Sequence, residues 1–165
     1  MTNIHASGPV PYSDFVGTAD PLALLASTPG QIARVVAHWQ PTRWLLSYSE
    51  GKWSAAQIVL HLSHDEITWS DRVRLALSVP DYVPVAYDGD EWVRLETPTD
   101  PDLALNAFLA LRRLNLILYH RLTAQQLEQP LHHPVVGEIT VAWILTRVAG
   151  HDLHHLKQLQ AIAVN

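Results

Sequence analysis

Apolar residues recur at helical intervals in two long segments of the chain. In the first segment the apolar positions are Ile58, Leu62, Trp69, Val73 and Ala76. In the second segment they are Val141, Ile144, Leu145, Val148, Leu156, Leu159 and Ile162. Steps of about three, four, seven or eight residues put these side chains on one face of an α-helix, which then packs toward the core. Both segments are therefore predicted to be amphipathic helices.

Capping residues place the start of the predicted second helix. Ser54 is a favourable N-cap, and Gln57 three residues later completes a capping-box pattern, so this helix runs from there to about Ser78. A first helix is predicted before it, from about Gly30 to His38.

The second half of the chain carries two further helix starts. Asp100 followed by Pro101 is a cap with a first-turn proline, and it predicts a third helix that continues to about Thr123. Thr140 is expected to cap a fourth helix that reaches almost to the C-terminus. The long connection 79–100 is typical of a segment that crosses a bundle or covers a site. The four helices predict an all-α fold, a four-helix bundle.

The predicted domain organisation is simple. Residues 1–20 lack clear periodicity and are expected to form an extended N-terminal arm, while residues 21–165 are expected to form a single helical domain. The chain contains 16 acidic and 11 basic residues and has no basic block, which argues against a nucleic-acid partner. With no membrane-spanning apolar run and no signal peptide, it is predicted to be a cytoplasmic protein with a small-molecule substrate.

Three histidines lie within the two apolar stripes. His61 belongs to the second helix, and His151 and His155 lie one turn apart on the fourth helix, with Cβ atoms about 5–6 Å apart. Burying a polar group without a partner costs about 1–3 kcal/mol, and one shared metal ion would satisfy all three imidazoles. Three protein ligands with an open position are typical of a catalytic metal site. The alternative is that each is a core histidine bonded to a carbonyl or carboxylate.

Two neighbouring histidines are rival ligands. His64 follows His61 by three residues, and His154 follows His151 by three. Helical geometry favours His151 with His155, because position 154 turns toward the flank of the stripe. Whether either rival joins the metal shell stays open at this point.

Two charged residues next to the trio are candidate catalytic groups. Asp65 lies one turn after His61, where it would orient a ligand imidazole or accept a proton. Its alternative role is an ion pair with Arg72 or another cation. Arg147 lies one turn before His151, where it would bind an anionic substrate or the carboxylate of a thiol. The alternative for Arg147 is a stem packed on the bundle with its head in water.

Three short sequences resemble those of a known family. The sequence Gly-Lys-Trp-Ser at 51–54, the sequence Val-Leu-His-Leu at 59–62 and the sequence His-Asp-Leu-His-His-Leu-Lys-Gln-Leu at 151–159 are similar to the DinB-like (DinB/YfiT) superfamily. The resemblance implies an up-down-down-up bundle with a long crossover between helices 2 and 3. It also implies a metal triad, which falls on the three histidines that periodicity selects.

The resemblance further implies several chemistries. Characterised relatives include enzymes that depend on low-molecular-weight thiols, so our leading hypothesis is a metal site that activates such a thiol for S-transfer. Because the chain has no cysteine, that thiol must come from outside. The alternatives are a metal-dependent hydrolase that uses an activated water, and a non-catalytic bundle that binds a metal or small molecule. Zinc or nickel is the expected metal, and a homodimer is the expected assembly.

Overall fold

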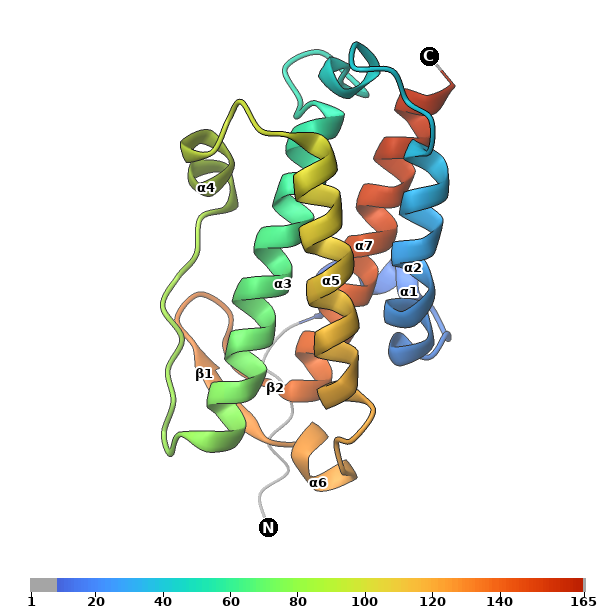
Figure 1. The fold of residues 1–165 in the computed structure, drawn as a ribbon. Coiled ribbons are helices and arrows are strands. Elements are labelled where there is room, and N and C mark those ends of the chain that lie inside the picture. Colours follow the sequence, from blue (N-terminus) through green and yellow to red (C-terminus); the bar gives the residue numbers. More distant parts are fainter. Residues whose placement is uncertain (1–8, 165) are drawn as a thin grey trace.

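Four long helices form a bundle in the computed structural model, which describes residues 9–164 (Figure 1). They are α2 (Pro21–Val36), α3 (Ala55–Ser78), α5 (Pro101–Tyr119) and α7 (Val141–Ala163). Helix α3 packs beside α5 and α7, and α2 packs beside the same two helices, so α2 and α3 lie at opposite corners. The sequence colours in Figure 1 show α2 and α7 running one way and α3 and α5 the other. This is the predicted up-down-down-up order.

The remaining elements are short. They are α1 (Ser13–Val16), a 3₁₀ turn (Arg43–Leu45), α4 (Gly89–Leu95), α6 (Ala124–Leu127), β1 (Pro130–His133) and β2 (Gly137–Thr140). The two strands pair antiparallel, with Leu131 opposite Ile139, where both side chains are buried. This small hairpin is an addition to the predicted four-helix bundle, whose long elements are all helices. The strands have only four residues each, too few for a visible alternating pattern.

The predicted caps of the second and fourth helices are confirmed. Ser54 Oγ accepts a hydrogen bond from the Gln57 backbone N–H, and the Gln57 side chain accepts one from the Ser54 N–H. Thr140 Oγ1 accepts from the Trp143 N–H at the start of α7. Because each cap satisfies orphan donors of the first turn, the start of each helix can be read directly from the residue types.

The first helix is longer than predicted. It begins at Pro21 after Asp20, whose carboxylate caps it, and it continues through Pro29. Proline removes the N–H that would bond the carbonyl of Leu25 four residues earlier. In the structure that carbonyl accepts a hydrogen bond from Arg112 Nη1 of α5 at 3.0 Å. The tertiary contact therefore compensates for the lost helical bond, which is why an internal proline did not end this helix.

Two other predicted boundaries are wrong. Helix α5 ends at Tyr119 rather than near Thr123, and Thr123 instead caps the separate short helix α6. Residues 1–20 were expected to form an extended arm. Residues 9–20 instead contain the short helix α1, which packs against α7. The first eight residues of that arm lie outside the described part of the chain.

The core is divided into two apolar clusters with a polar layer between them. One cluster joins Trp69 and Val73 of α3 to the first half of α7, and the other joins Ile58 and Leu62 to its second half. The polar layer includes a buried ion network in which Arg112 contacts Glu66 and Asp152. The histidines of interest lie in this same layer, so the bundle places its buried polar groups at mid-height.

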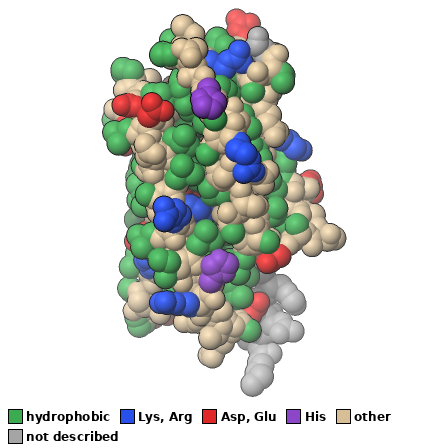
Figure 2. Space-filling model, turned by 45° about the vertical axis from the view of Figure 1, so that its right-hand side comes forward, with side chains coloured by type: hydrophobic (Ala, Val, Ile, Leu, Met, Phe, Trp, Pro, Cys, Tyr) green, Lys and Arg blue, Asp and Glu red, His purple; other side chains and the backbone are tan. Residues whose placement is uncertain are grey.

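The helices of the described chain do not meet what a membrane span requires. Within residues 9–164, none of the helices combines the length and apolar character that a bilayer span requires. On the face drawn in Figure 2, Lys and Arg side chains are spread among apolar ones rather than gathered into one block.

Candidate metal centre

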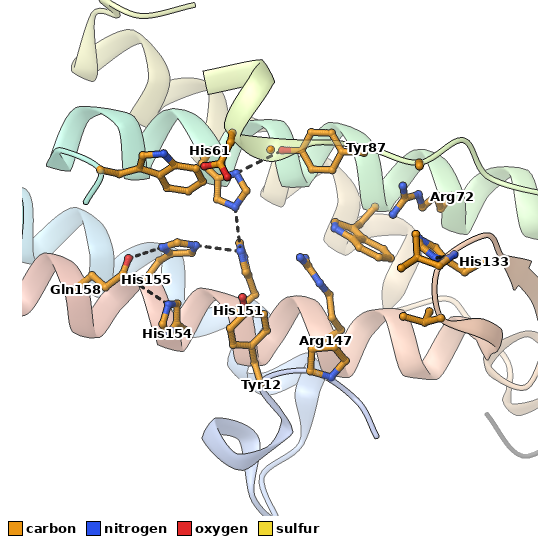
Figure 3. Close-up of a pocket in the computed structure, with 18 of the residues that line it drawn as sticks. Tyr12, His61, Arg72, Tyr87, His133, Arg147, His151, His154, His155 and Gln158 are labelled. Carbon is orange, nitrogen blue, oxygen red and sulfur yellow. Dashed lines mark hydrogen bonds between the residues drawn. The ribbon is translucent and has the colours of Figure 1, made fainter. Parts of the chain in front are cut away.

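The three predicted histidines meet between α3 and α7. Nε2 of His151 lies 3.0 Å from Nε2 of His61 and 3.0 Å from Nε2 of His155 (Figure 3). One donor nitrogen from each of the three residues lies within 4.8 Å of the others, and all three side chains are buried. The structure therefore brings together, from two helices, the trio that the spacing selected.

Outer contacts fix which ring nitrogen of two of these histidines carries the proton. His155 Nδ1 lies 2.7 Å from Oε1 of Gln158, which can only accept, so Nδ1 is the protonated nitrogen. His151 Nδ1 lies 3.1 Å from the carboxylate Oδ2 of Asp65, which favours a proton on the same nitrogen. Both rings then present Nε2 lone pairs to each other at 3.0 Å. Facing lone pairs repel unless a cation lies between them, so this donor set fits a divalent metal ion.

Burial keeps these imidazoles neutral. Desolvation lowers the pKa of His151 and His155 well below 6.5, and the neighbouring histidines and Arg147 lower it further. The pKa of His61 is lowered by burial first, with the nearby Asp65 carboxylate partly offsetting the shift. Neutral imidazole is the form that binds a metal, so near neutral pH all three are in the ligand form.

Asp65 and Arg147 form an ion pair across the two helices. Arg147 Nη1 donates to Oδ2 of Asp65, the same oxygen that lies near His151. The cation that pairs with Asp65 is therefore Arg147 rather than Arg72. The Arg147 side chain is only 14% exposed, and its guanidinium lies 4.3 Å from the Trp69 ring centroid. The alternative of a solvated Arg147 head is therefore wrong.

The two rival histidines lie outside the cluster. His64 Nε2 lies 3.2 Å from a carboxylate oxygen of Glu96, and its ring meets Trp92 edge-on. His154 Nε2 lies 2.9 Å from Nε2 of Gln158, on the flank of α7. Neither ring nitrogen contact involves a residue of the trio. For His154 this agrees with the helical geometry, which turned position 154 toward the flank of the apolar stripe.

A cavity of about 780 Å³ opens onto the three imidazoles. Trp53 and Trp69 both line it. The Trp53 ring centroid lies 4.6 Å from that of His61, so Trp53 forms part of the site wall. A cavity of this volume is within the range of small-molecule sites.

Sequence reasoning missed the residues that come from outside the two ligand helices. Tyr87, from the long connection, has its hydroxyl 3.4 Å from Nδ1 of His61. Tyr12, from the N-terminal segment, packs its ring edge-on against His151 at 5.3 Å. The length of the connection indicated that it crosses the bundle or covers a site, but neither segment has a periodic pattern that would place Tyr87 or Tyr12 beside the histidines.

Comparisons with known proteins agree with this arrangement. The sequence profile of the DinB superfamily matches residues 24–159. A protein of Oceanobacillus iheyensis is 28% identical over 120 residues, which are 72% of this chain and 69% of that protein. YfiT of Bacillus subtilis is 24% identical over 147 residues, 86% of this chain and 82% of YfiT. The names of both relatives record an inferred metal-dependent hydrolase activity.

The solved structure of YfiT shares the fold. It superposes with a TM-score of 0.82 at 24% identity, covering 87% of this chain and 84% of YfiT. YfiT is described as having an unusual four-helix bundle topology. The up-down-down-up order seen here is thus shared with a solved relative.

Proposed function

The chain belongs to the DinB superfamily, and we propose that it is a metal-dependent hydrolase whose metal ion is held by His61, His151 and His155. The observation that carries the proposal is the convergence of three buried, neutral imidazoles on the wall of a cavity large enough for a small molecule. The inferred hydrolase activity of its relatives supports the choice of reaction.

The chain's own residues prepare the ligand shell. The Gln158 side chain keeps the proton of His155 on Nδ1, and the Asp65 carboxylate 3.1 Å from Nδ1 of His151 favours a proton there, so both Nε2 atoms are free to coordinate. When bound, a divalent metal supplies a Lewis acid and a coordinated water whose pKa falls toward about 7 for zinc. Burial of the trio excludes bulk water from the side of the bundle core, so the site is open only toward the cavity.

Asp65 is the proposed orienting carboxylate of the site. Its Oδ2 is engaged by Arg147 and lies 3.1 Å from Nδ1 of His151. Its Oδ1 has no hydrogen-bond partner among the described residues and lies 3.9 Å from Nε2 of His61. Because Oδ1 is buried and Asp65 does not line the cavity, this carboxylate supports the reaction through its contacts with the ligand histidines and Arg147. Arg147, which lines the cavity, stabilises negative charge that develops on the substrate.

Thiol S-transfer, our leading hypothesis from the sequence, is now the second candidate. A metal ion with three protein ligands also deprotonates a coordinated thiol, and the cavity has room for one. No described feature identifies a thiol subsite, whereas the relatives are named for hydrolysis. We therefore place hydrolysis first.

Isotope labelling separates the two reactions. Zinc- or nickel-loaded protein is incubated in ¹⁸O-labelled water with a panel of aryl esters and anilides, with and without glutathione. Hydrolysis predicts ¹⁸O in the acid product without thiol, and its loss in His151→Ala but not in His132→Ala on the hairpin. Turnover that requires glutathione, releases the phenol or aniline and yields an S-acyl glutathione thioester would instead establish S-transfer.

A further inference from the structure

The cavity has a second polar end, formed by two arginines that contact one indole ring. The guanidinium carbons of Arg72 and Arg147 lie 4.2 and 4.3 Å from the centroid of Trp69. Both arginines line the same cavity as the three imidazoles. Figure 3 shows Arg72 beside His133, at the end of the cavity away from His155.

Arg72 is buried without a matching negative charge. It is 3% exposed, and its Nη2 donates to the carbonyl oxygen of Val85 at 3.0 Å. Within the described chain Arg72 forms no ion pair, since the nearby Asp65 carboxylate is bound to Arg147. A buried cation is normally paired, so an unpaired one on a cavity wall indicates a place for an external anion.

The aromatic ring of His133 beside Arg72 is neutral. Burial lowers the pKa of His133, and the charges of Arg72 and Arg147 lower it further, so this ring adds no positive charge. The His133 ring lies parallel to that of Trp69, with centroids 5.9 Å apart. This end of the cavity thus combines two aromatic rings with two guanidinium groups that lie over the Trp69 indole.

The charge balance favours a singly charged anion. Arg72 and Arg147 contribute two positive charges and Asp65 removes one, which leaves one. Lys52 and Asp90, which line the cavity together with the two arginines, offset each other, whereas Asp65 acts through its ion pair with Arg147. A guanidinium presents parallel N–H donors that match the two oxygens of a carboxylate. A carboxylate therefore fits this end better than a doubly charged phosphate.

We propose that Arg72 binds a carboxylate of the substrate, so that the bond hydrolysed at the histidine trio belongs to an ester or amide of a small organic acid. The assignment of the hydrolysed bond rests on the proposed function, whereas the carboxylate site does not. Trp143 and Val136, which also line the cavity, would contact the apolar body of such a substrate.

The carboxylate site is tested in metal-free protein, so that coordination to a metal does not contribute. Calorimetry compares phenylacetate with its neutral analogue phenylacetamide. The wild-type protein is expected to bind phenylacetate at least tenfold more tightly than the amide. Arg72→Gln should lose this preference, and Arg72→Lys, which keeps the charge, should retain part of it.

A second pair of variants covers the case in which Arg72→Gln fails to fold. Val135 is 75% exposed on the hairpin, lines the cavity, and donates its N–H to His133. Val135→Glu places a competing carboxylate at this end and should weaken phenylacetate binding at least tenfold, whereas Val135→Gln should not.

Three results would overturn the proposal: no phenylacetate binding to wild type, equal binding of acid and amide, or undiminished phenylacetate binding by Val135→Glu. The proposed function fails separately. His151→Ala removes a metal ligand but should keep the preference for phenylacetate over the amide. If the wild-type protein binds phenylacetate but hydrolyses no ester, the carboxylate site stands and the proposed hydrolase function fails.

Discussion

The backbone of Gly89 packs directly against the imidazole of His61. A Cβ atom at position 89 would lie 2.8 Å from Cε1 and 3.1 Å from Nδ1 of this ring. The hydroxyl of Tyr87, from the same segment, lies 3.4 Å from Nδ1. The long connection between α3 and α5 is therefore part of the candidate metal centre, because it closes the side of His61 that faces away from α7.

Gly89→Ala is expected to weaken metal binding about tenfold or more, in the range seen when groups that orient metal ligands are changed. Alanine suits a helix better than glycine, so the helix itself would gain from the change. The loss would come from displacement of the His61 ring. Competition titration with a chromophoric chelator measures the affinity. Glu91→Ala, on the same short helix, is the control, and equal affinities in both variants would contradict the role of Gly89.

Gly150→Ala is expected to detach the N-terminal segment from α7. A Cβ at position 150 would lie 2.3 Å from the carbonyl oxygen of Tyr12, so the backbone at Tyr12 must move. Chymotrypsin should then cleave after Tyr12 or Phe15 faster than in wild type, as followed by mass spectrometry.

Gly30→Ala is the matched control for this helix substitution. Its Cβ would meet only Arg34 Nη1, at an ordinary 3.6 Å, so it should be neutral or stabilise the protein by up to about 1 kcal/mol. Similar cleavage rates in Gly30→Ala and Gly150→Ala would show that the Tyr12 contact does not hold the segment.

Asp65→Asn is expected to lower metal affinity by about 10- to 100-fold and to destabilise the fold. The neutral amide no longer compensates Arg147 and no longer favours a proton on Nδ1 of His151. Metal titration and urea unfolding measure the two effects. Asp71→Asn, on the exposed side of the same helix, should change neither. If Asp65→Asn bound the metal with the affinity of the wild-type protein, Asp65 would have no role in orienting the ligand histidines.

The metal-free protein should lose stability as the pH falls below about 6.5. The pKa values of His61, His151 and His155 are lowered in the folded state, so the unfolded chain binds more protons below 6.5. Each histidine contributes at most about 1.4 kcal/mol per pH unit, and the contribution is fully present above 6.5.

Urea unfolding between pH 7.5 and pH 5.0 checks this dependence. His155→Gln should show a shallower fall in the free energy of unfolding than wild type, because one titrating group is gone. Parallel slopes for the two proteins would contradict the assignment of neutral buried imidazoles.

The ligand trio could be predicted from sequence because its information is local. His151 and His155 share a helix face by spacing alone, and His61 lies within an apolar stripe that must face the core. The helix starts at Ser54 and Thr140 could also be predicted, because a capping side chain accepts a hydrogen bond from a backbone N–H of its own first turn.

The rest of the site depends on contacts between distant segments. Helix α2 continues through Pro29 only because Arg112, from another helix, takes the place of the missing N–H. Arg147 turned inward because Asp65 lies opposite it on α3. The positions of Tyr12 and the long connection follow from packing against α7 and His61, which no local pattern encodes.

Metal content tests the central claim most directly. Tag-free wild type, His151→Ala and His154→Ala are dialysed exhaustively and analysed for all transition metals. The account predicts about one zinc or nickel ion per chain in wild type and in His154→Ala, and a loss of that metal in His151→Ala. Equal metal content in wild type and His151→Ala would contradict the three-histidine site.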